Sequence, residues 1–162
     1  MSEKNKQVPE SEDSRTFFAY VRVSTQKQVG GGLESQIHAV HKFCRENEIK
    51  NIKIFQDEAI SGAKSSRPAL DQMMKEIKEG KCKMVIVFAF SRLSRSVSHL
   101  LQCIDTFEKH NTKFCSITER IQTDTVIGKT LVTILGALAQ LERDLIRERV
   151  VSGIERARLR GV

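Results

Sequence analysis

The sequence has 162 residues, of which 40% are hydrophobic and 29% are charged, and it carries a formal net charge of +7. This length is enough for one domain with one buried core and leaves little room for a second. The surplus of positive charge makes a polyanion the expected partner.

Residues 1–16 carry seven charges of mixed sign and no apolar run, which predicts a disordered tail without an export signal or membrane segment. The four cysteines are widely spaced and form no C-x-x-C pair, so neither a zinc ribbon nor a disulfide framework is indicated. We therefore expect a cytoplasmic protein whose cysteines are reduced core residues.

Strand and helix patterns alternate between residues 17 and 124. Ser66 is the expected N-cap of the helix that begins at SSRP, and Leu70, Met74 and Ile77 are expected to line its buried face. The expected elements are strands at 17–23, 51–58, 82–90 and 112–119 and helices at 28–47, 65–81 and 91–111.

This alternation favours the α/β class, as a three-layer, mostly parallel sheet with helices on both faces. The segment CKMVIVFAF (82–90) is almost continuously apolar, which is typical of a central strand covered on both sides. In such sheets ligands bind beyond the carboxyl ends of the strands.

The last segment, residues 125–162, breaks the alternation. It has no proline and keeps apolar residues three or four apart, which predicts one projecting helix of about 50 Å. Six arginines against three acids lie between residues 143 and 160. We expect a dimer interface that extends onto DNA, and a solvated, salt-bridged helix end is the plainer alternative. The expected interface residues are Leu131, Ile134, Leu138, Leu141 and Leu145.

Arginines gather where two of the predicted strands end. Arg22 stands two residues before Ser24 at the end of the strand FFAYVRV, with one apolar face on its odd-numbered positions. The stretch SRLSRS follows the third strand, and its Arg92 and Arg95 are three apart, as on one side of a helix start. Because parallel strands end at one edge, these three arginines should surround the Ser24 hydroxyl.

Several guanidiniums around one hydroxyl suit a phosphodiester, because they hold its oxygens bidentately and offset charge in the transition state. Arg67, in the loop after the second strand, is placed to join them. The alternative is that the arginines form ion pairs with acidic residues, for which the candidates are Glu34, Asp57, Glu58 and Glu119.

Other catalytic motifs are weaker. The glycines at 30–32 lack the remaining residues of a dinucleotide or P-loop signature and suggest a hinge. His38, His41 and Cys44 lie one helical step apart, but without a fourth ligand they favour an ordinary amphipathic helix over a metal site. No histidine is expected at a strand end for a Ser-His-Asp triad, and only residues 57–58 offer paired carboxylates there.

Four segments together resemble the catalytic domain of the serine recombinases, the resolvase and DNA-invertase family: YVRVSTQKQ, DEAISGAKSSRPALDQM, VFAFSRLSRS and TLVTILGALAQLERDLIRERVVSGIERARLRG. The similarity runs from about residue 18 to the last residue. It implies that a serine attacks a DNA phosphodiester, leaving a 5′-phosphoserine link and a free 3′ hydroxyl. It also implies homodimers that form a tetramer in the active synapse, exchange of ends by rotation of half of that tetramer, and rejoining without a metal or other cofactor.

By position, the resemblance places the nucleophile at Ser24 and the active-site glutamine at Gln28. It assigns the phosphate to Arg22, Arg92 and Arg95. Two further positions, Ser61 and Arg67, match the loop after the second strand. In the long helix, Arg143 and Arg149 match arginines near the DNA, with acidic Glu142 and Glu148 beside them. The DNA-binding residues that we expect are Arg143, Arg149, Arg156, Arg158 and Arg160.

Two features depart from the family pattern. Ser91 stands where small resolvases usually carry an aspartate before the first arginine, so Arg92 lacks that positioning carboxylate. The sequence ends at Val162, where the family's helix leads to a DNA-binding domain, so we expect this part alone to bind DNA weakly and with little sequence preference.

Two other functions compete with a cutting recombinase. One is a recombinase-like regulator that dimerises and contacts DNA without cutting, which gives no reason for a serine among arginines. The other is a small-anion enzyme such as a phosphatase, which gives no reason for the long helix.

Overall fold

The structure is a computed structural model that describes residues 15–23, 29–58 and 66–159. The elements, in chain order, are β1 (Thr16–Val23), α1 (Val29–Glu46), β2 (Ile52–Glu58), α2 (Pro68–Lys78), β3 (Cys82–Val87), α3 (Phe90–Leu93), α4 (Val97–Lys109), β4 (Lys113–Ser116), β5 (Ile121–Gln122) and α5 (Val126–Leu159). The predicted strands and helices are present, with one helix divided into α3 and α4. The disordered tail and the domain boundaries stay predictions.

The sheet has the strand order β2-β1-β3-β4-β5. The first four of these strands are parallel, and β5 pairs antiparallel with β4. The predicted parallel sheet is therefore confirmed, with the short edge strand β5 as an addition. Two residues are too few to show a strand pattern in the sequence.

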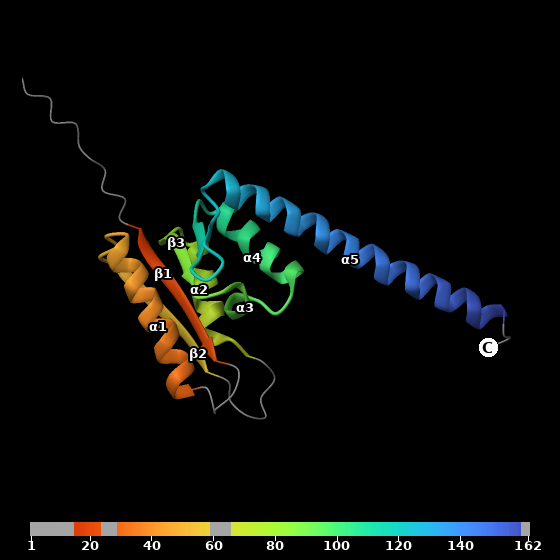
Figure 1. Ribbon diagram of the computed structural model, residues 1–162, viewed down its shortest axis with the longest axis horizontal. Coiled ribbons are helices and arrows are strands. Elements are labelled where there is room, and N and C mark those ends of the chain that lie inside the picture. The colour runs from red at the N-terminus through yellow and green to blue at the C-terminus, as the bar shows by residue number, and fades with distance from the viewer. Residues whose placement is uncertain (1–14, 24–28, 59–65, 160–162) are drawn as a thin grey trace, which may run out of the picture.

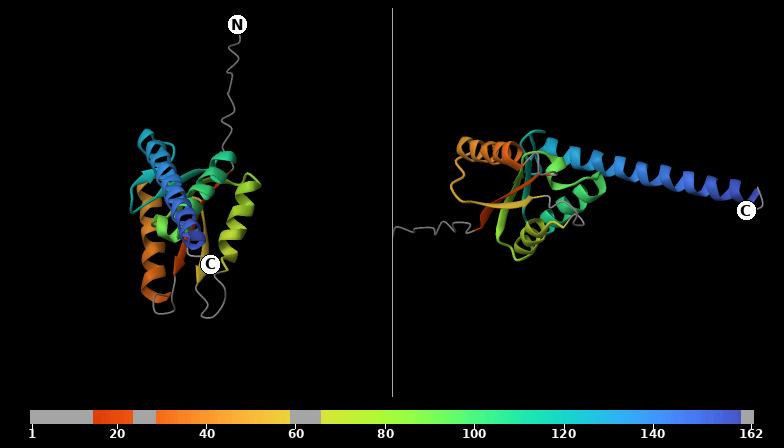
Figure 2. Two further views of the ribbon diagram at one scale, coloured as in Figure 1. Left: turned by 90° about the vertical axis from the view of Figure 1, so that its right-hand side faces the viewer. Right: turned by 90° about the horizontal axis from the view of Figure 1, so that it is seen from below.

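Helices cover both faces of the sheet, as predicted (Figure 2). On one face, α1 packs by Leu33, Val40 and Cys44 against β1 and β3. On the other face, α2 and α4 enclose the larger apolar cluster around Phe18 and Tyr20. The expectation of a single apolar face on β1 is wrong, because this strand lies between β2 and β3 under helices on both sides.

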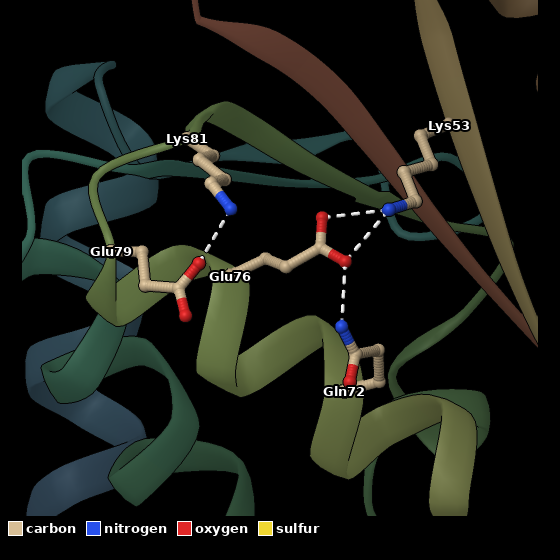
Figure 3. Close-up of polar contacts among 5 residues, drawn as sticks. All are labelled: Lys53, Gln72, Glu76, Glu79 and Lys81. Atoms are coloured by element: carbon tan, nitrogen blue, oxygen red, sulfur yellow. Dashed lines mark hydrogen bonds and ion pairs between the residues drawn. The ribbon is translucent and has the colours of Figure 1, made fainter.

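The buried face of α2 is turned slightly from the predicted one. Met73, not Met74, is buried with Leu70 and Ile77. Glu76 is also turned inward, where its carboxylate oxygens each lie 2.7 Å from Nζ of Lys53 on β2 (Figure 3). The Gln72 amide donates to the same carboxylate, so α2 is attached to the sheet by charge as well as by apolar contact.

The predicted long helix is confirmed as α5, whose 34 residues extend for about 50 Å and project far from the sheet (Figure 1). Val132 and Leu135 pack against the core of their own domain, and Ala139 is buried. No helix in the described part of the chain is long and apolar enough to span a membrane.

Four of the five predicted interface residues of α5 lie on a different side of the helix from Val132, Leu135 and Ala139. Leu131 is half-buried, and the others are exposed: Ile134, Leu138, Leu141 and Leu145. Further along, Val150 and Ile154 are exposed too. The helix thus presents an apolar stripe that its own domain does not cover.

Candidate active site

The end of β1 holds a buried arginine. Arg22 is 8% exposed, and its guanidinium donates to the carbonyl oxygens of Ser91 (3.2 Å, from Nη2) and Arg92 (3.4 Å, from Nε). Its main chain is fixed by the amide of Gln36 on α1, which accepts from the Arg22 N–H (3.3 Å) and donates to the Arg22 carbonyl oxygen (3.1 Å). The sheet edge and two helices therefore hold this cation in place.

The short helix α3 carries the second arginine. Arg92 Nη1 donates to the carbonyl oxygen of Arg22 (3.5 Å), and its Nε is buried without a hydrogen-bond partner among the described residues. The start of α3 is fixed by Glu119, whose carboxylate accepts the N–H of Phe90 (3.3 Å) and the hydroxyl of Ser116. A carboxylate thus lies beside α3 without forming an ion pair with Arg92.

Arg67, the residue directly before α2, also contacts α3. Its Nη1 donates to the carbonyl oxygen of Leu93 (2.6 Å). The predicted Ser66 cap of α2 is wrong: Arg67 is the N-cap residue and its side chain forms no cap bond. Instead the carboxylate of Asp57 on β2 accepts the N–H groups of Ala69 (2.9 Å) and Leu70 (3.0 Å). A distant carboxylate that caps α2 leaves no local trace in the sequence.

Asp57 also accepts the hydroxyl of Tyr20 (2.9 Å). Burial raises the pKa of Tyr20 well above its ordinary value, and the Asp57 carboxylate raises it further. Asp57 therefore joins β1, β2 and α2 through neutral donors and forms no ion pair with an arginine.

Three arginines lie close enough to Arg22 to repel its charge. Burial lowers the pKa of Arg22, and the charges of Arg67 and Arg95 lower it further, with Arg92 acting in the same direction. Among the described residues, no carboxylate forms an ion pair with any of them, so the alternative of internal ion pairs is wrong for this part of the chain. We name Arg22, Arg67, Arg92 and Arg95 the arginine cluster. Such uncompensated guanidiniums suit a bound anion.

Arg95 lies between α3 and α4, and not at the start of a helix as predicted. Arg92 and Arg95 do not share a helix side, because α3 ends at Leu93 and the chain is extended at Ser94 and Ser96. Arg95 and Arg67 both line a pocket of about 410 Å³ between α2 and α4. The other residues of this pocket are Ser66, Leu70, Asp71, Ser94, Ser96 and His99.

A larger pocket of about 610 Å³ lies between α1 and the start of α5. Phe43, Cys115 and Ile117 line it, and its charged residues are Lys42, Glu46 and Arg120. It opens on the sheet face that α1 covers and contains no arginine of the cluster, so it carries no argument for the chemistry.

Several predicted residues lie outside the described part of the chain: Ser24, Gln28, Ser61 and Arg160. The side chain of Arg156 is likewise not described. Arg143 donates to the Ser98 hydroxyl (3.4 Å) and to Gln140 (2.8 Å), while Arg149 and Arg158 are exposed. Glycines 30–32 belong to the first turns of α1, so the predicted hinge is wrong.

The cysteines and the candidate metal ligands lie apart from the arginine cluster. All four cysteines are free and buried, as predicted, and burial raises the pKa of Cys82 to about 12 and those of Cys103 and Cys115 to about 11. Among the described residues, no group of three or more His, Cys, Asp or Glu side chains is placed to hold a metal ion. His38 and His41 are exposed whereas Cys44 is buried, so these three side chains do not converge.

Sequence reasoning missed Gln36, Tyr20 and the role of Asp57, which contact the arginines or their elements from other parts of the chain. It expected no histidine near the ends of the strands, yet α4 brings His99 into the pocket of Arg67 and Arg95. The signal that could have found it is its position three residues after Ser96, at the start of that helix.

The mostly parallel sheet, the arginines at the end of β1 and after β3, and the long projecting helix agree with the serine recombinase catalytic domain that the sequence resembles. The family model "Resolvase, N terminal domain" matches residues 17–162, and the chain belongs to this family. The chain is 38% identical over 145 residues to the transposon Tn917 resolvase of Enterococcus faecalis, covering 90% of this chain and 72% of that protein. It is 34% identical to the serine recombinase gin of Escherichia phage Mu, covering 90% and 69%.

Solved structures agree with the fold. A resolvase family site-specific recombinase from Streptococcus pneumoniae matches with a TM-score of 0.74 at 27% identity, covering 89% of this chain and 99% of that one. The N-terminal catalytic domain of TP901-1 integrase matches with a TM-score of 0.70 at 32% identity, covering 81% and 98%. The predicted family and fold class are confirmed.

Proposed function

We propose that this chain cuts and rejoins DNA at specific sites, with Ser24 as the nucleophile and the arginine cluster as the phosphate site. The observation that carries the proposal is the arginine cluster itself, in which Arg22 is repelled by the other three arginines and no described carboxylate forms an ion pair with any of the four. Membership of the resolvase family supports the same reaction.

In the proposed step, Ser24 Oγ forms a bond to the phosphorus of a DNA phosphodiester. The bond from phosphorus to the 3′ oxygen breaks, and that oxygen leaves with the electron pair and, in net, the serine proton. The product is a 5′-phosphoserine and a free 3′ hydroxyl. The attack of another 3′ hydroxyl on the phosphoserine reverses the step, so the bond energy is conserved and no cofactor is needed.

The arginines would bind the nonbridging phosphate oxygens and offset the charge that builds up on them in the transition state. Arg22 comes from the end of β1 and Arg92 from α3, whereas Arg67 and Arg95 line the pocket between α2 and α4. Gln28 and Ser61 are proposed as further site residues from the family resemblance.

The proposed assembly is a homodimer that pairs into a tetramer on two DNA duplexes. The uncovered apolar stripe of α5 supports self-association, because large exposed apolar patches mark sites of protein contact. Beyond it, the basic residues of α5 would bind the DNA backbone: Arg143, Arg149, Arg156, Arg158 and Arg160. The cytoplasmic location stays a prediction.

The test first identifies the DNA site. The full-length protein is mixed with sheared host DNA, and the fragments that become covalently attached to it are sequenced. The sequence shared by captured fragments is then made as a duplex with a nick next to the cut position, so that the free end diffuses away and the adduct accumulates. Peptide mapping is expected to place the phosphate on Ser24. Ser24→Ala should form no adduct, whereas the control Ser35→Ala, on the exposed side of α1, should match the wild type.

An adduct on another residue, or one undiminished in Ser24→Ala, would refute the proposed mechanism. DNA binding and dimerisation without any adduct would instead indicate the non-cutting regulator.

A further inference from the structure

The connection between α3 and α4 is held at the Ser94 hydroxyl. This buried group donates to the carbonyl oxygen of Ser96 (2.8 Å), accepts the N–H of Ser96 (3.2 Å) and lies 2.9 Å from Nδ1 of His99. A hydroxyl has one proton and two lone pairs. Since the proton is given to Ser96 and one lone pair takes the Ser96 N–H, the remaining lone pair is satisfied if His99 Nδ1 carries a hydrogen.

This arrangement is a variant of a capping box. Ser96 is the N-cap of α4, and its side chain accepts the N–H of His99, three residues later (3.2 Å). In a capping box the side chain at that later position reaches back to the N–H of the N-cap residue. Here the Ser94 hydroxyl lies between them, bound by the Ser96 N–H on one side and the His99 ring on the other.

The His99 ring is oriented at both nitrogens. Nδ1 faces Ser94, and Nε2 lies 3.9 Å from Sγ of Cys103, which is buried on the next turn of α4. The thiol can donate weakly to Nε2 when the ring hydrogen is on Nδ1.

Arg95 lies between the two serines that these hydrogen bonds hold. Its neighbours Ser94 (φ −139°, ψ 154°) and Ser96 (φ −136°, ψ 150°) are extended, and both are fixed by the bonds described above. The Arg95 side chain itself is exposed and lines the pocket between α2 and α4. Its guanidinium is therefore available to a ligand, and the direction in which it points depends on the main chain around it.

We propose that His99 is a positioning residue, which holds the main chain on both sides of Arg95 through the Ser94 hydroxyl and so presents the Arg95 guanidinium to the DNA phosphate. The proposal rests on the proposed function, since the phosphate is that of the reacting DNA. Besides Arg95, the charged residues that line the same pocket as His99 are Arg67 and Asp71.

The first test needs no DNA. Nitrogen–proton correlation spectra of the imidazole rings of the full-length protein report which nitrogen carries the hydrogen in the neutral form. We expect hydrogen on Nδ1 for His99 and a shift towards Nε2 in Ser94→Ala. His38 and His41 on α1, which lie far from Ser94 along the chain, serve as internal references. Hydrogen on Nε2 of His99 in the wild type would overturn the proposal, whatever the protein does to DNA.

The second test measures the rate of adduct formation on the nicked duplex. His99→Leu should lower this rate about tenfold, because a displaced guanidinium loses phosphate contact. His99→Asn should largely keep it, because the Asn side-chain N–H occupies the place of Nδ1–H. His110→Leu, at the other end of α4, is the control, and melting temperatures detect any loss of folding.

A cycle with Arg95 separates positioning from a general structural effect. In an Arg95→Ala background, His99→Leu should cause no further loss of rate. Equal losses in both backgrounds, or an unchanged rate in His99→Leu alone, would overturn the positioning role while the proposed function stands. If the wild type forms no adduct, the proposed function fails and the hydrogen position on His99 still decides whether the Ser94 contact exists.

Discussion

Arg22 and Arg92 each bind the main chain of the other: Arg22 Nε donates to the carbonyl oxygen of Arg92 (3.4 Å), and Arg92 Nη1 donates to the carbonyl oxygen of Arg22 (3.5 Å). Two cations are thus held side by side by neutral acceptors. Their repulsion is not offset by a carboxylate among the described residues, and Arg92 Nε is left without a partner. An anion that enters the arginine cluster should therefore stabilise the fold.

The first prediction concerns Arg22→Met. The change removes a buried charge that its neighbours repel and keeps a long apolar side chain, so the free energy of unfolding should stay equal or rise by about 1 kcal/mol. Adduct formation should be lost. Urea unfolding and the nicked-duplex assay measure the two effects. A loss of stability of about 2 kcal/mol or more would show that the bonds to the carbonyl oxygens outweigh the repulsion.

The effect of sulfate on the wild type and on Arg22→Met tests whether the arginine cluster binds an anion. Sulfate should raise the melting temperature of the wild type more than chloride at equal ionic strength, because a divalent oxyanion fills the arginine cluster. General effects of sulfate on protein surfaces should remain in Arg22→Met. The difference between the two proteins therefore isolates the bound ion.

The second prediction concerns Asp57, which ties α2 to the sheet. Asp57→Asn should lower the free energy of unfolding by about 1–3 kcal/mol, because one amide oxygen cannot accept from Tyr20, Ala69 and Leu70 together. Tyr20→Phe removes one of these bonds and should cost about 1 kcal/mol. Urea unfolding compares them. Equal losses in the two variants would mean that the α2 cap contributes little.

The third prediction concerns the pH dependence of stability. The bond from Lys53, and then that from Gln72, lower the pKa of Glu76 below its ordinary value. Because the pKa is lower in the folded state, the contact stabilises the protein above the unfolded pKa of about 4.3, and this stability is lost as the pH falls through the folded value. Glu76→Gln should therefore cost about 1 kcal/mol at neutral pH, with a discount for the half-exposed Lys53.

In acid, Glu76→Gln and the wild type should converge in stability, since both side chains are then uncharged. Glu79→Gln is the control: Glu79 pairs with Lys81 at the surface, and its loss should change little at any pH (Figure 3). A Glu76→Gln cost that persists unchanged in acid would refute the role of the charge.

The sequence predicted the arginines at the sheet edge because a general rule places the carboxyl ends of parallel strands together. It did not predict the break between α3 and α4, because the residues from Ser91 to Ser98 include no proline or glycine that would end a helix. It also did not predict the bonds of Asp57 and Gln36, because each joins elements that are distant along the chain. Local patterns identify the charged groups, and tertiary contacts decide how they are held.

The fourth prediction concerns DNA contact by α5. Arg149 is exposed, so Arg149→Ala should weaken DNA binding and reduce the slope of log affinity against log salt concentration by about 1. Lys109→Ala is the control, because Lys109 pairs with Asp105 at the far end of α4. Fluorescence anisotropy at several salt concentrations measures both slopes. An unchanged slope in Arg149→Ala would place this residue away from the DNA backbone.

The last prediction concerns self-association through α5. Val132 and Leu135 pack on their own domain, while Leu141 and Leu145 lie on another side of the helix and are 54% and 43% exposed. Leu141→Glu with Leu145→Glu should shift the protein towards the monomer in sedimentation experiments, because buried carboxylates oppose a helix interface. Thr133→Glu, an exposed position outside that stripe, should keep the wild-type distribution. If the double variant sediments like the wild type, the stripe is not the contact that joins the subunits.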